Sequence, residues 1–513
     1  MAGSPCFTAP ALTELAALNA QRGAATPARR SSANRPRARE TRVSGAKGGR
    51  LRNMVPVVSA ANSSSADADT NADAPMSAKE RADAANRALM EWLGENGMHI
   101  SDSAGWGVPP HSLVISNETT DDFEPSGRGL LARREITQSE ALFQIPKALV
   151  ITKSTAQQLL GKHVITDETD EFIALALALL TESTKGARSF YKPYLDIIPS
   201  MEELNPLFLW SEEDRQVLRG SPTLIAAESL KQKLVREYEM VMQDIVLKHA
   251  DVFPARNGEA FMSQQDWNWA FAVLFSRTIC FPSTKELALV PYADLMNHSS
   301  FCACFFDCRK GGSMFDRQEF VVLYSDRDYK QAEQVYVTYG QKSNAELLLL
   351  YGFVVERNPF DSVELCVSLS EQDPLYDRKR NTLDDWGLPT VSRFPLFQDR
   401  YPKELIEYLR FCCATEKEMD ADFGEFVSRQ NEDSVAAALI EACEAALEGY
   451  PNSIEEDEAL LGDRSLYSML TQNMKWAIKL RRAEKRILKR TITNTQRERK
   501  RPSLMFSATA GRA

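Results

Sequence analysis

The sequence predicts an α+β protein in which short β-strands flank an inserted helical region and a helical domain follows. Short apolar segments bounded by turn residues occur on both sides of the insertion, as expected for strands. Residues 154–277 instead have mostly helical spacing, and from about Ser370 the pattern indicates helices only. We therefore expect a domain at 96–355, interrupted at about 154–270, and an all-α domain at 370–490.

The first predicted elements are a helix and two strands. Ser77 and Glu80 have the spacing of a capping box, which predicts a helix from Ser77 to Gly94 or Gly97. The apolar segments 127–132 and 140–146 are separated by a polar turn and are predicted to pair as strands. The glycines in Gly127-Arg128-Gly129 do not form a dinucleotide-binding motif, because the third glycine and the following helix are absent.

The insertion is predicted to contain three main helices. Residues 172–180 are almost wholly apolar and follow Asp170, so we expect a buried helix there. Residues 224–248 have a mixed helical pattern, and a further helix begins at Ser263 and ends near Arg277.

Strands are expected again after the insertion, at 287–290, 320–324 and 334–338. A second capping box, Ser343 to Glu346, opens a short helix that Gly352 ends.

The C-terminal domain is predicted from three helical segments, at 405–412, 434–447 and from Ser465 to about Arg490. Residues 491–513 are expected to be a basic tail.

The first 60 residues are rich in Ala, Ser and Arg and contain ten Lys and Arg residues against two acids, Glu14 and Glu40. This composition is typical of a plastid or mitochondrial transit peptide, and a disordered basic tail is the alternative. Residues 61–74 are polar and of low complexity, so 61–95 is interpreted as a linker followed by the first helix.

The remaining chain is acidic, since the whole protein has a net charge of −10 despite its basic start. An acidic body argues against nucleic acid as a partner. No run approaches 18 uninterrupted apolar residues, so we expect no membrane partner either. The protein is expected to be a monomer.

The nine cysteines are scattered, which suits free thiols in a reducing compartment. Cys302, Cys304 and Cys308 form a C-x-C-x3-C cluster that could bind zinc, but no fourth ligand lies nearby. Alternate residues of a strand would put Cys302 and Cys304 on one face, where small thiols pack well. We favour packing and expect no metal.

The most informative motifs lie between residues 288 and 353. They are Val-Pro-Tyr-Ala-Asp-Leu-Met-Asn-His-Ser at 290–299, Val-Tyr-Val-Thr-Tyr-Gly at 335–340, Ser-Asn-Ala-Glu-Leu at 343–347 and Tyr-Gly-Phe at 351–353. Together they resemble the catalytic half of SET-domain protein methyltransferases. The most similar branch contains the plant Rubisco large-subunit lysine methyltransferases, and an actin-histidine methyltransferase branch shares the class.

The resemblance covers roughly residues 95–490. It implies a split SET domain with a pseudo-knot at 96–355, and a helical domain at 370–490 that docks the protein substrate. It also implies S-adenosylmethionine as the cofactor. Methyl transfer is an in-line displacement that needs no metal, in agreement with the lack of a motif such as His-Glu-x-x-His.

The resemblance assigns the catalytic role to Tyr339, whose hydroxyl would lie beside the methyl group and the acceptor nitrogen. A phenol has a reference pKa near 10 and is neutral at working pH, so it would orient the amine. A tyrosine that only packs its ring is the alternative. Asn297 and His298 would bind the cofactor in the pseudo-knot, whereas the pair alone would indicate a turn.

Further site residues follow from the same resemblance. Tyr351 would line the lysine channel and attract a methylated ammonium through cation–π contact. Arg277 would meet cofactor and substrate, although a cation at a helix C-terminus needs no such role. Asp294 would contact the substrate, or else cap a turn. The cofactor-binding segment of the N-terminal strands is matched by Glu140, Ala141 and Leu142.

The sequence thus predicts a chloroplast stromal, S-adenosylmethionine-dependent protein-lysine N-methyltransferase. The Rubisco large subunit and plastid fructose-bisphosphate aldolase are the candidate substrates by resemblance. The alternatives are a histidine acceptor and a non-catalytic interaction module. The chain departs from the plant Rubisco enzymes at Phe281, where they tend to have an arginine, and this leaves the identity of the protein substrate open.

Overall fold

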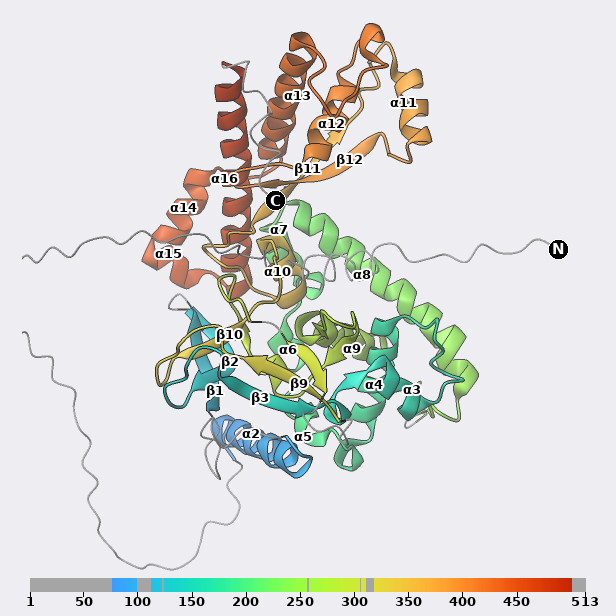
Figure 1. Ribbon diagram of the computed structural model, residues 1–513, viewed down its shortest axis with the longest axis vertical. Helices are drawn as coiled ribbons and strands as arrows, with labels where there is room; N and C mark the ends of the chain where they lie inside the picture. The colour runs from blue at the N-terminus through green and yellow to red at the C-terminus, as the bar shows by residue number, and fades with distance from the viewer. Residues whose placement is uncertain are drawn as a thin grey trace, which may run out of the picture.

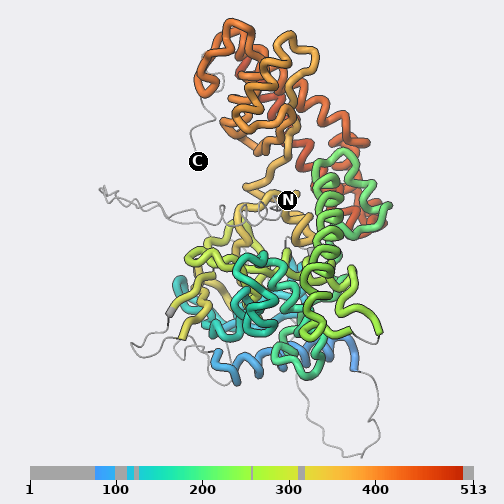
Figure 2. Tube along the Cα trace, turned by 90° about the vertical axis from the view of Figure 1, so that its right-hand side faces the viewer, coloured from blue at the N-terminus to red at the C-terminus, as the bar shows by residue number. Residues whose placement is uncertain are grey.

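Two lobes make up the part of the chain that the structure, a computed structural model, describes (Figure 1). The strands and the inserted helices form one lobe, and the C-terminal domain forms the other, as the view from the side also shows (Figure 2). The described residues are 76–98, 112–121, 124–255, 258–304, 306–310 and 318–500. The predicted transit peptide, most of the linker and residues 501–513 lie outside them.

The lobe begins with helix α2 (Ala78–Glu95), which starts at the capping box of Ser77 and Glu80, as predicted. The first sheet has the order β1-β2-β10-β7. Asn86 of α2 donates from Nδ2 to Asn117 Oδ1 of β1 at 2.9 Å, so this helix is tied to the sheet. The strands are β1 (Leu113–Asp121), β2 (Glu124–Ala132), β10 (Gln334–Val337) and β7 (Asn297–His298).

Two further sheets complete the strand layer. One has the order β3-β9-β8 and the other the order β4-β6-β5. Their strands are β3 (Ala141–Pro146), β9 (Glu319–Tyr324), β8 (Asp307–Lys310), β4 (Ile151–Thr152), β6 (Leu287–Leu289) and β5 (Ile279–Cys280).

The predicted pairing of segments 127–132 and 140–146 is wrong, although each segment is a strand. The first lies in β2, which pairs with β1 and β10, and the second lies in β3, which pairs with β9. The physical reason is that β9 and β10 offer each segment an apolar partner from far along the chain. Leu130 lies opposite Val335, for example, and Ile145 lies opposite Val321.

The insertion is helical, as predicted. Helix α4 begins where the Asp170 carboxylate accepts hydrogen bonds from the amides of Phe172 and Ile173, and its apolar stretch is buried on every side. Helix α9 starts at a capping box made by Ser263 and packs on α4. The helices are α3 (Lys153–Leu160), α4 (Glu171–Thr184), α5 (Lys192–Leu195), α6 (Met201–Leu204), α7 (Glu212–Gln216), α8 (Pro222–Val241) and α9 (Gln264–Arg277).

After the strands, α10 (Asn344–Tyr351) begins at the Ser343 capping box and ends at Gly352, which adopts φ +80°, as predicted. The C-terminal domain is mainly helical but not all-α, because β11 and β12 pair antiparallel within it. Its elements are β11 (Ser362–Ser368), α11 (Tyr376–Asp385), β12 (Val391–Phe397), α12 (Lys403–Cys412), α13 (Arg429–Glu448), α14 (Ile454–Gly462), α15 (Arg464–Met469) and α16 (Gln472–Arg499).

Helix α16 differs from the prediction at both ends. The chain leaves the helical path at Leu470, so α15 and α16 are separate helices. At the other end, residues 491–499 belong to α16 and bury Thr491 and Thr495, so they are not part of a tail. No helix among the described residues is long and apolar enough to cross a membrane.

The two lobes are joined by buried polar contacts along α16. Asp457 of α14 accepts from Arg481 at 2.5 Å and forms an ion pair with Lys485 at 2.7 Å. Arg481 also donates to the carbonyl of Val217, which follows α7 in the insertion. Three hydroxyl groups, those of Ser221, Thr223 and Tyr450, donate to the buried carboxylate of Glu484.

The buried carboxyl group of Glu484 at this junction should make the stability of the folded protein depend on pH. Burial raises the pKa of Glu484 from its ordinary value of 4.5 to about 7, so the folded state binds this proton more tightly than the unfolded chain. The stabilisation is complete below pH 4.5 and is lost as the pH rises through 7. The loss should be on the order of 3 kcal/mol.

The measurement is urea denaturation of the wild type and Glu484→Gln at about pH 5 and pH 8. The wild type should weaken relative to the variant at the higher pH. Asp361 also has a pKa raised by burial, to about 6, and its charge adds to the raised pKa of Glu484, so the comparison reports Glu484 together with its coupling to Asp361. A difference between the two proteins that does not change with pH would contradict this role.

Candidate active site

The site depends on a parallel pairing between two short strands that are distant in sequence. Asn297 and His298 of β7 lie opposite Tyr336 and Val337 of β10. The amide of Ser299 then donates to the Val337 carbonyl at 3.0 Å and extends the pairing by one bond. Tyr339, two residues beyond β10, is therefore held beside the Asn-His pair.

His298 holds the backbone of this strand end. Its Nδ1 accepts a hydrogen bond from the amide of Tyr339 at 3.0 Å, and its Nε2 lies 3.2 Å from the Ser300 hydroxyl. A neutral ring with the proton on Nε2 satisfies both contacts. Burial lowers the pKa of His298 to about 4, so the ring is uncharged at neutral pH. This arrangement suits an anchor for Tyr339.

The Tyr339 side chain is fixed at both its ring and its hydroxyl. The hydroxyl donates to the carbonyl of Met296 at 2.8 Å. The ring stacks on His298, with centroids 5.0 Å apart, and on Tyr351, with centroids 4.8 Å apart. Burial raises the pKa of Tyr339 to about 12, so the phenol is neutral. Because its proton is directed to Met296, the lone pairs of its oxygen remain free to accept another hydrogen bond.

Aromatic rings continue the surface from Tyr339. Tyr351 is the last residue of α10, and Phe353 follows it with its ring centroid 6.3 Å from those of both Tyr351 and His298. Burial raises the pKa of Tyr351, so its phenol is also uncharged. The result is an aromatic wall that can accept an aliphatic chain or a cation.

A charged group lies next to these rings. Arg277, the last residue of α9, donates to the Asp294 carbonyl at 3.1 Å and to its carboxylate at 3.2 Å. The buried Tyr194 hydroxyl donates to the same carboxylate at 2.8 Å. Burial raises the pKa of Asp294, and the charge of Arg277 opposes that shift.

Three polar atoms of this region have no hydrogen-bond partner among the described residues. They are Oδ1 of Asp294, Nε of Arg277 and the hydroxyl oxygen of Tyr292. Buried polar atoms are nearly always satisfied in proteins, so these three atoms are under-satisfied in the arrangement seen here. The Arg277 side chain keeps 17% of its surface exposed, so it can contact a ligand.

Strand β2 approaches this group from the other side and was missed by the sequence reasoning. Asn297 donates from Nδ2 to Gln334 at 2.7 Å and to Thr119 at 3.1 Å. A Cβ on Gly129 would lie 2.7 Å from that same Nδ2, so only glycine fits there. The half-buried Arg128 precedes it, and its pKa is lowered by burial and by the charge of Arg277.

The signal for this segment was the pair of glycines around Arg128, which was tested only as a dinucleotide-binding motif. The segment predicted instead, Glu140 to Leu142, has its contacts elsewhere. The Glu140 carboxylate pairs with Arg134 at 2.6 Å, Ala141 pairs with Tyr324, and the Leu142 side chain is fully buried. These contacts give no support to a cofactor-binding role, which stays a prediction.

The cysteine cluster also differs from its prediction. Cys302 and Cys304 lie in the loop between β7 and β8 and not in a strand, so strand alternation does not explain their position. Cys308 is a residue of β8.

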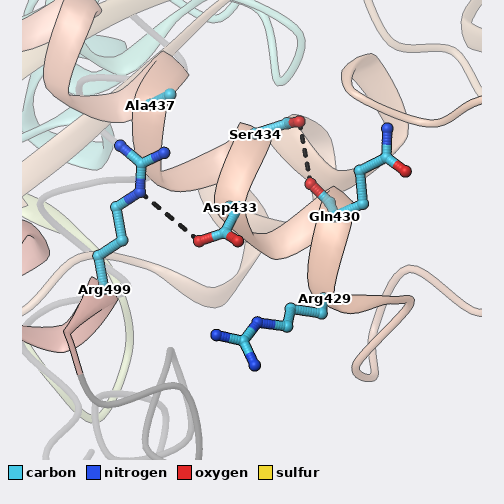
Figure 3. Close-up of a pocket in the computed structure, with 6 residues that line it drawn as sticks. All are labelled: Arg429, Gln430, Asp433, Ser434, Ala437 and Arg499. Carbon is cyan, nitrogen blue, oxygen red and sulfur yellow. Dashed lines mark hydrogen bonds and ion pairs between the residues drawn. The ribbon is translucent and has the colours of Figure 1, made fainter.

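Two cavities lie in the C-terminal domain and contain no residue of this site. One has a volume of about 500 Å³ and lies beside α13, where Arg499 and Asp433 form an ion pair at 3.5 Å (Figure 3). Another, of about 540 Å³, includes the half-exposed Trp386 and residues of α12. The residues of the first are Arg429, Gln430, Asp433, Ser434, Ala437 and Arg499.

Comparison with protein families gives two matches. A model described as SET domain matches residues 127–340. A model described as Rubisco LSMT substrate-binding matches residues 370–488. The first includes β2, the insertion, β7 and Tyr339, and the second includes most of the C-terminal domain.

Three curated relatives illustrate the range of similar proteins. A Rubisco large-subunit N-methyltransferase of Pisum sativum is 29% identical over 78% of this chain and 79% of its own length. A fructose-bisphosphate aldolase-lysine N-methyltransferase of Arabidopsis thaliana is 30% identical over 71% of this chain and 76% of its own. An actin-histidine N-methyltransferase of Homo sapiens is 30% identical over 79% of this chain and 67% of its own length.

Two solved structures are similar to this chain over most of its length. The SET domain of LSMT bound to lysine and AdoHcy has a TM-score of 0.67 at 26% identity, over 84% of this chain and 97% of the other. Rubisco LSMT bound to AdoMet has a TM-score of 0.63 at 26% identity, over 83% of this chain and 97% of the other.

The contact between β2 and Asn297 leads to a prediction. Gly129→Ala should displace the Asn297 amide from Gln334 and destabilise the protein by roughly 1–3 kcal/mol, the usual cost of overpacking a tight site. Gly94→Ala is the control, because it lies in α2 and an added Cβ there meets nothing within 4 Å. Chemical denaturation measures the free energy of unfolding of both variants. If Gly129→Ala is as stable as the wild type, β2 does not constrain Asn297.

Proposed function

Because this chain belongs to the SET-domain methyltransferase family that includes the Rubisco large-subunit enzymes, we propose that it methylates lysine side chains of a plastid protein. One observation carries the proposal. The neutral phenol of Tyr339 stacks on Tyr351 and interacts electrostatically with the pair of Arg277 and Asp294.

The site suits S-adenosylmethionine, the cofactor of the family. Arg277 keeps part of its side chain exposed and offers a hydrogen-bond donor for polar groups of a ligand. Gly129 is buried, and the side chains of Asn297, Gln334 and Thr119 fill the space where its Cβ would lie, so this glycine lets the Asn297 amide lie close against β2. When bound, S-adenosylmethionine supplies a methyl group on a positively charged sulfur. Arg277, Asn297 and His298, with residues 127–129, would hold it.

Tyr339 is the proposed catalytic residue. Its proton is held by the Met296 carbonyl, so its oxygen can accept a hydrogen bond from the incoming amine and fix the direction of the nitrogen lone pair. Because the Tyr339 hydroxyl stays neutral, it brings no full negative charge into the site during methyl transfer.

The acceptor side chain would lie along the aromatic wall. Tyr351 stacks on Tyr339 and offers its ring to the methylene stem and the ammonium group of a lysine. Asp294 is fully buried and is held by Arg277 and Tyr194, so it would act on the bound substrate by fixing the position of Arg277.

The lysine acceptor and the plastid location rest on similarity and composition. By their names, one chloroplastic relative methylates a lysine of fructose-bisphosphate aldolase and another methylates the Rubisco large subunit. The basic, acid-poor first 60 residues are typical of a transit peptide. A histidine acceptor is the second candidate, since an actin-histidine enzyme is equally similar. Phe281 is fully buried, so the position where plant Rubisco enzymes tend to carry an arginine offers no charge to the substrate.

The direct test is incubation of the whole protein with methyl-labelled S-adenosylmethionine and a plastid stromal extract, followed by mapping of the labelled residue by mass spectrometry. We expect label on a lysine of a stromal protein. Label on a histidine would favour the second candidate. Cofactor binding without transfer to any protein would instead favour a non-catalytic interaction module.

The division of roles predicts opposite effects for two substitutions. Tyr339→Phe keeps the stacked ring but removes the hydroxyl, so turnover should fall by about 10²-fold or more while cofactor affinity changes only a few-fold. Asn297→Ala removes a hydrogen-bonded amide and should weaken cofactor binding by roughly 1–3 kcal/mol. Steady-state kinetics and cofactor titration measure the two effects.

Tyr238→Phe is the matched control for Tyr339→Phe. Its hydroxyl also donates to a backbone carbonyl, that of Met262 at 3.3 Å, but it lies on α8 in the insertion. We expect its turnover to equal that of the wild type. If Tyr339→Phe also turns over like the wild type, another group is the catalyst.

A further inference from the structure

Three potential metal ligands meet on the side of β10 that faces the loop after β7. The sulfur atoms of Cys302 and Cys304 and a carboxylate oxygen of Asp326 all lie within 4.8 Å of one another. Cys304 is 5% exposed, whereas Cys302 and Asp326 are half-buried. The two cysteines belong to the β7–β8 loop, and Asp326 follows β9, so the tertiary fold brings them together.

Each ligand is oriented by a contact of its own, and the Cys304 thiol donates to the Tyr324 carbonyl at 3.1 Å. The amide of Cys304 donates to the Cys302 sulfur at 3.3 Å. The Asp326 carboxylate accepts from the Tyr329 hydroxyl at 2.8 Å and from the Ala303 amide at 3.1 Å. Hydrogen bonds of this kind to thiolate and carboxylate ligands fix their direction and raise their affinity for a metal.

Simple packing accounts poorly for this group. The Tyr329 hydroxyl and the Ala303 amide satisfy the half-buried Asp326 carboxylate in part, but within the described residues no Lys, Arg or His forms an ion pair with it. The guanidinium nearest in sequence, that of Arg327, pairs with Glu333 and lies over the Tyr329 ring. A divalent cation would supply the missing positive charge.

We propose that Cys302, Cys304 and Asp326 bind a zinc-like divalent ion. Two thiolates and one carboxylate are a ligand set that zinc accepts in tetrahedral sites. The exposed sides of Cys302 and Asp326 leave the fourth position to water. On binding, the two thiols release their protons to solvent, and neither the sulfur atoms nor the metal change oxidation state.

The ion would connect the loop after His298 to the turn after β9, behind the strand end that carries Tyr339. The Thr338 amide donates to the Cys304 carbonyl at 3.4 Å, and the Cys302 thiol lies 3.2 Å from the Tyr336 carbonyl. The ion therefore supports the backbone of β10 and takes no part in methyl transfer. This site goes beyond the proposed function, and its failure would leave the assignment of Tyr339 unchanged.

The test is a titration of the reduced, metal-free whole protein with Co²⁺ as a spectroscopic probe, followed by displacement with Zn²⁺. We expect one equivalent to bind, with thiolate-to-cobalt charge-transfer absorption and release of about two protons per ion. Cys304→Ser and Asp326→Asn should each weaken binding by about 100-fold or more. Cys308→Ser is the control and should bind like the wild type, because Cys308 lies in β8 outside the group.

Circular dichroism would show whether Cys304→Ser folds, and Asp326→Asn is the variant to use if it does not. Absence of stoichiometric binding would overturn the proposal, and so would equal affinity in the wild type and Asp326→Asn. Formation of a Cys302–Cys304 disulfide in a protein that binds no metal when reduced would also overturn it.

Discussion

The parallel pairing of β7 with β10 is the constraint on which the rest of the site depends. It is short, and it would be weak alone, but side chains reinforce it from both sides. His298 accepts from the Tyr339 amide, and the Asn297 amide group holds Gln334 of β10 and Thr119 of β1. Because these contacts cross between segments far apart in sequence, the position of Tyr339 follows from the whole sheet and not from its own strand.

The helices were predictable because their ends are set by local chemistry. The capping boxes at Ser77 and Ser343 and the side chain of Asp170 each satisfy amides within three residues, so the sequence alone indicates where these helices begin. Strand pairing is not local, and the nearest apolar segment proved to be the wrong partner for β2. The β11–β12 pair was missed although β11 alternates buried and exposed residues, because its surroundings are otherwise helical.

In the candidate site, residues with recognisable side chains could be predicted from the sequence, whereas features that depend on the folded backbone could not. The motifs at 290–299 and 335–353 named the residues that the fold brings together around Tyr339 and Arg277, because each contributes a recognisable side chain. Gly129 matters because it has no side chain. The reason is visible only in the fold, where a Cβ added to Gly129 would lie 2.7 Å from the Asn297 amide nitrogen. The proximity of Asp326 to the cysteines likewise depends on the turn after β9, which no spacing in the sequence reveals.

The most direct measurement for this account is a crystal structure of the protein with S-adenosylhomocysteine and a lysine-containing peptide. The account predicts that the cofactor product contacts Arg277, Asn297 and the backbone near Gly129. The lysine should lie along Tyr351, with its nitrogen within hydrogen-bonding reach of the Tyr339 hydroxyl. A cofactor bound at β3 beside Glu140, or a lysine that enters without meeting Tyr339, would contradict it.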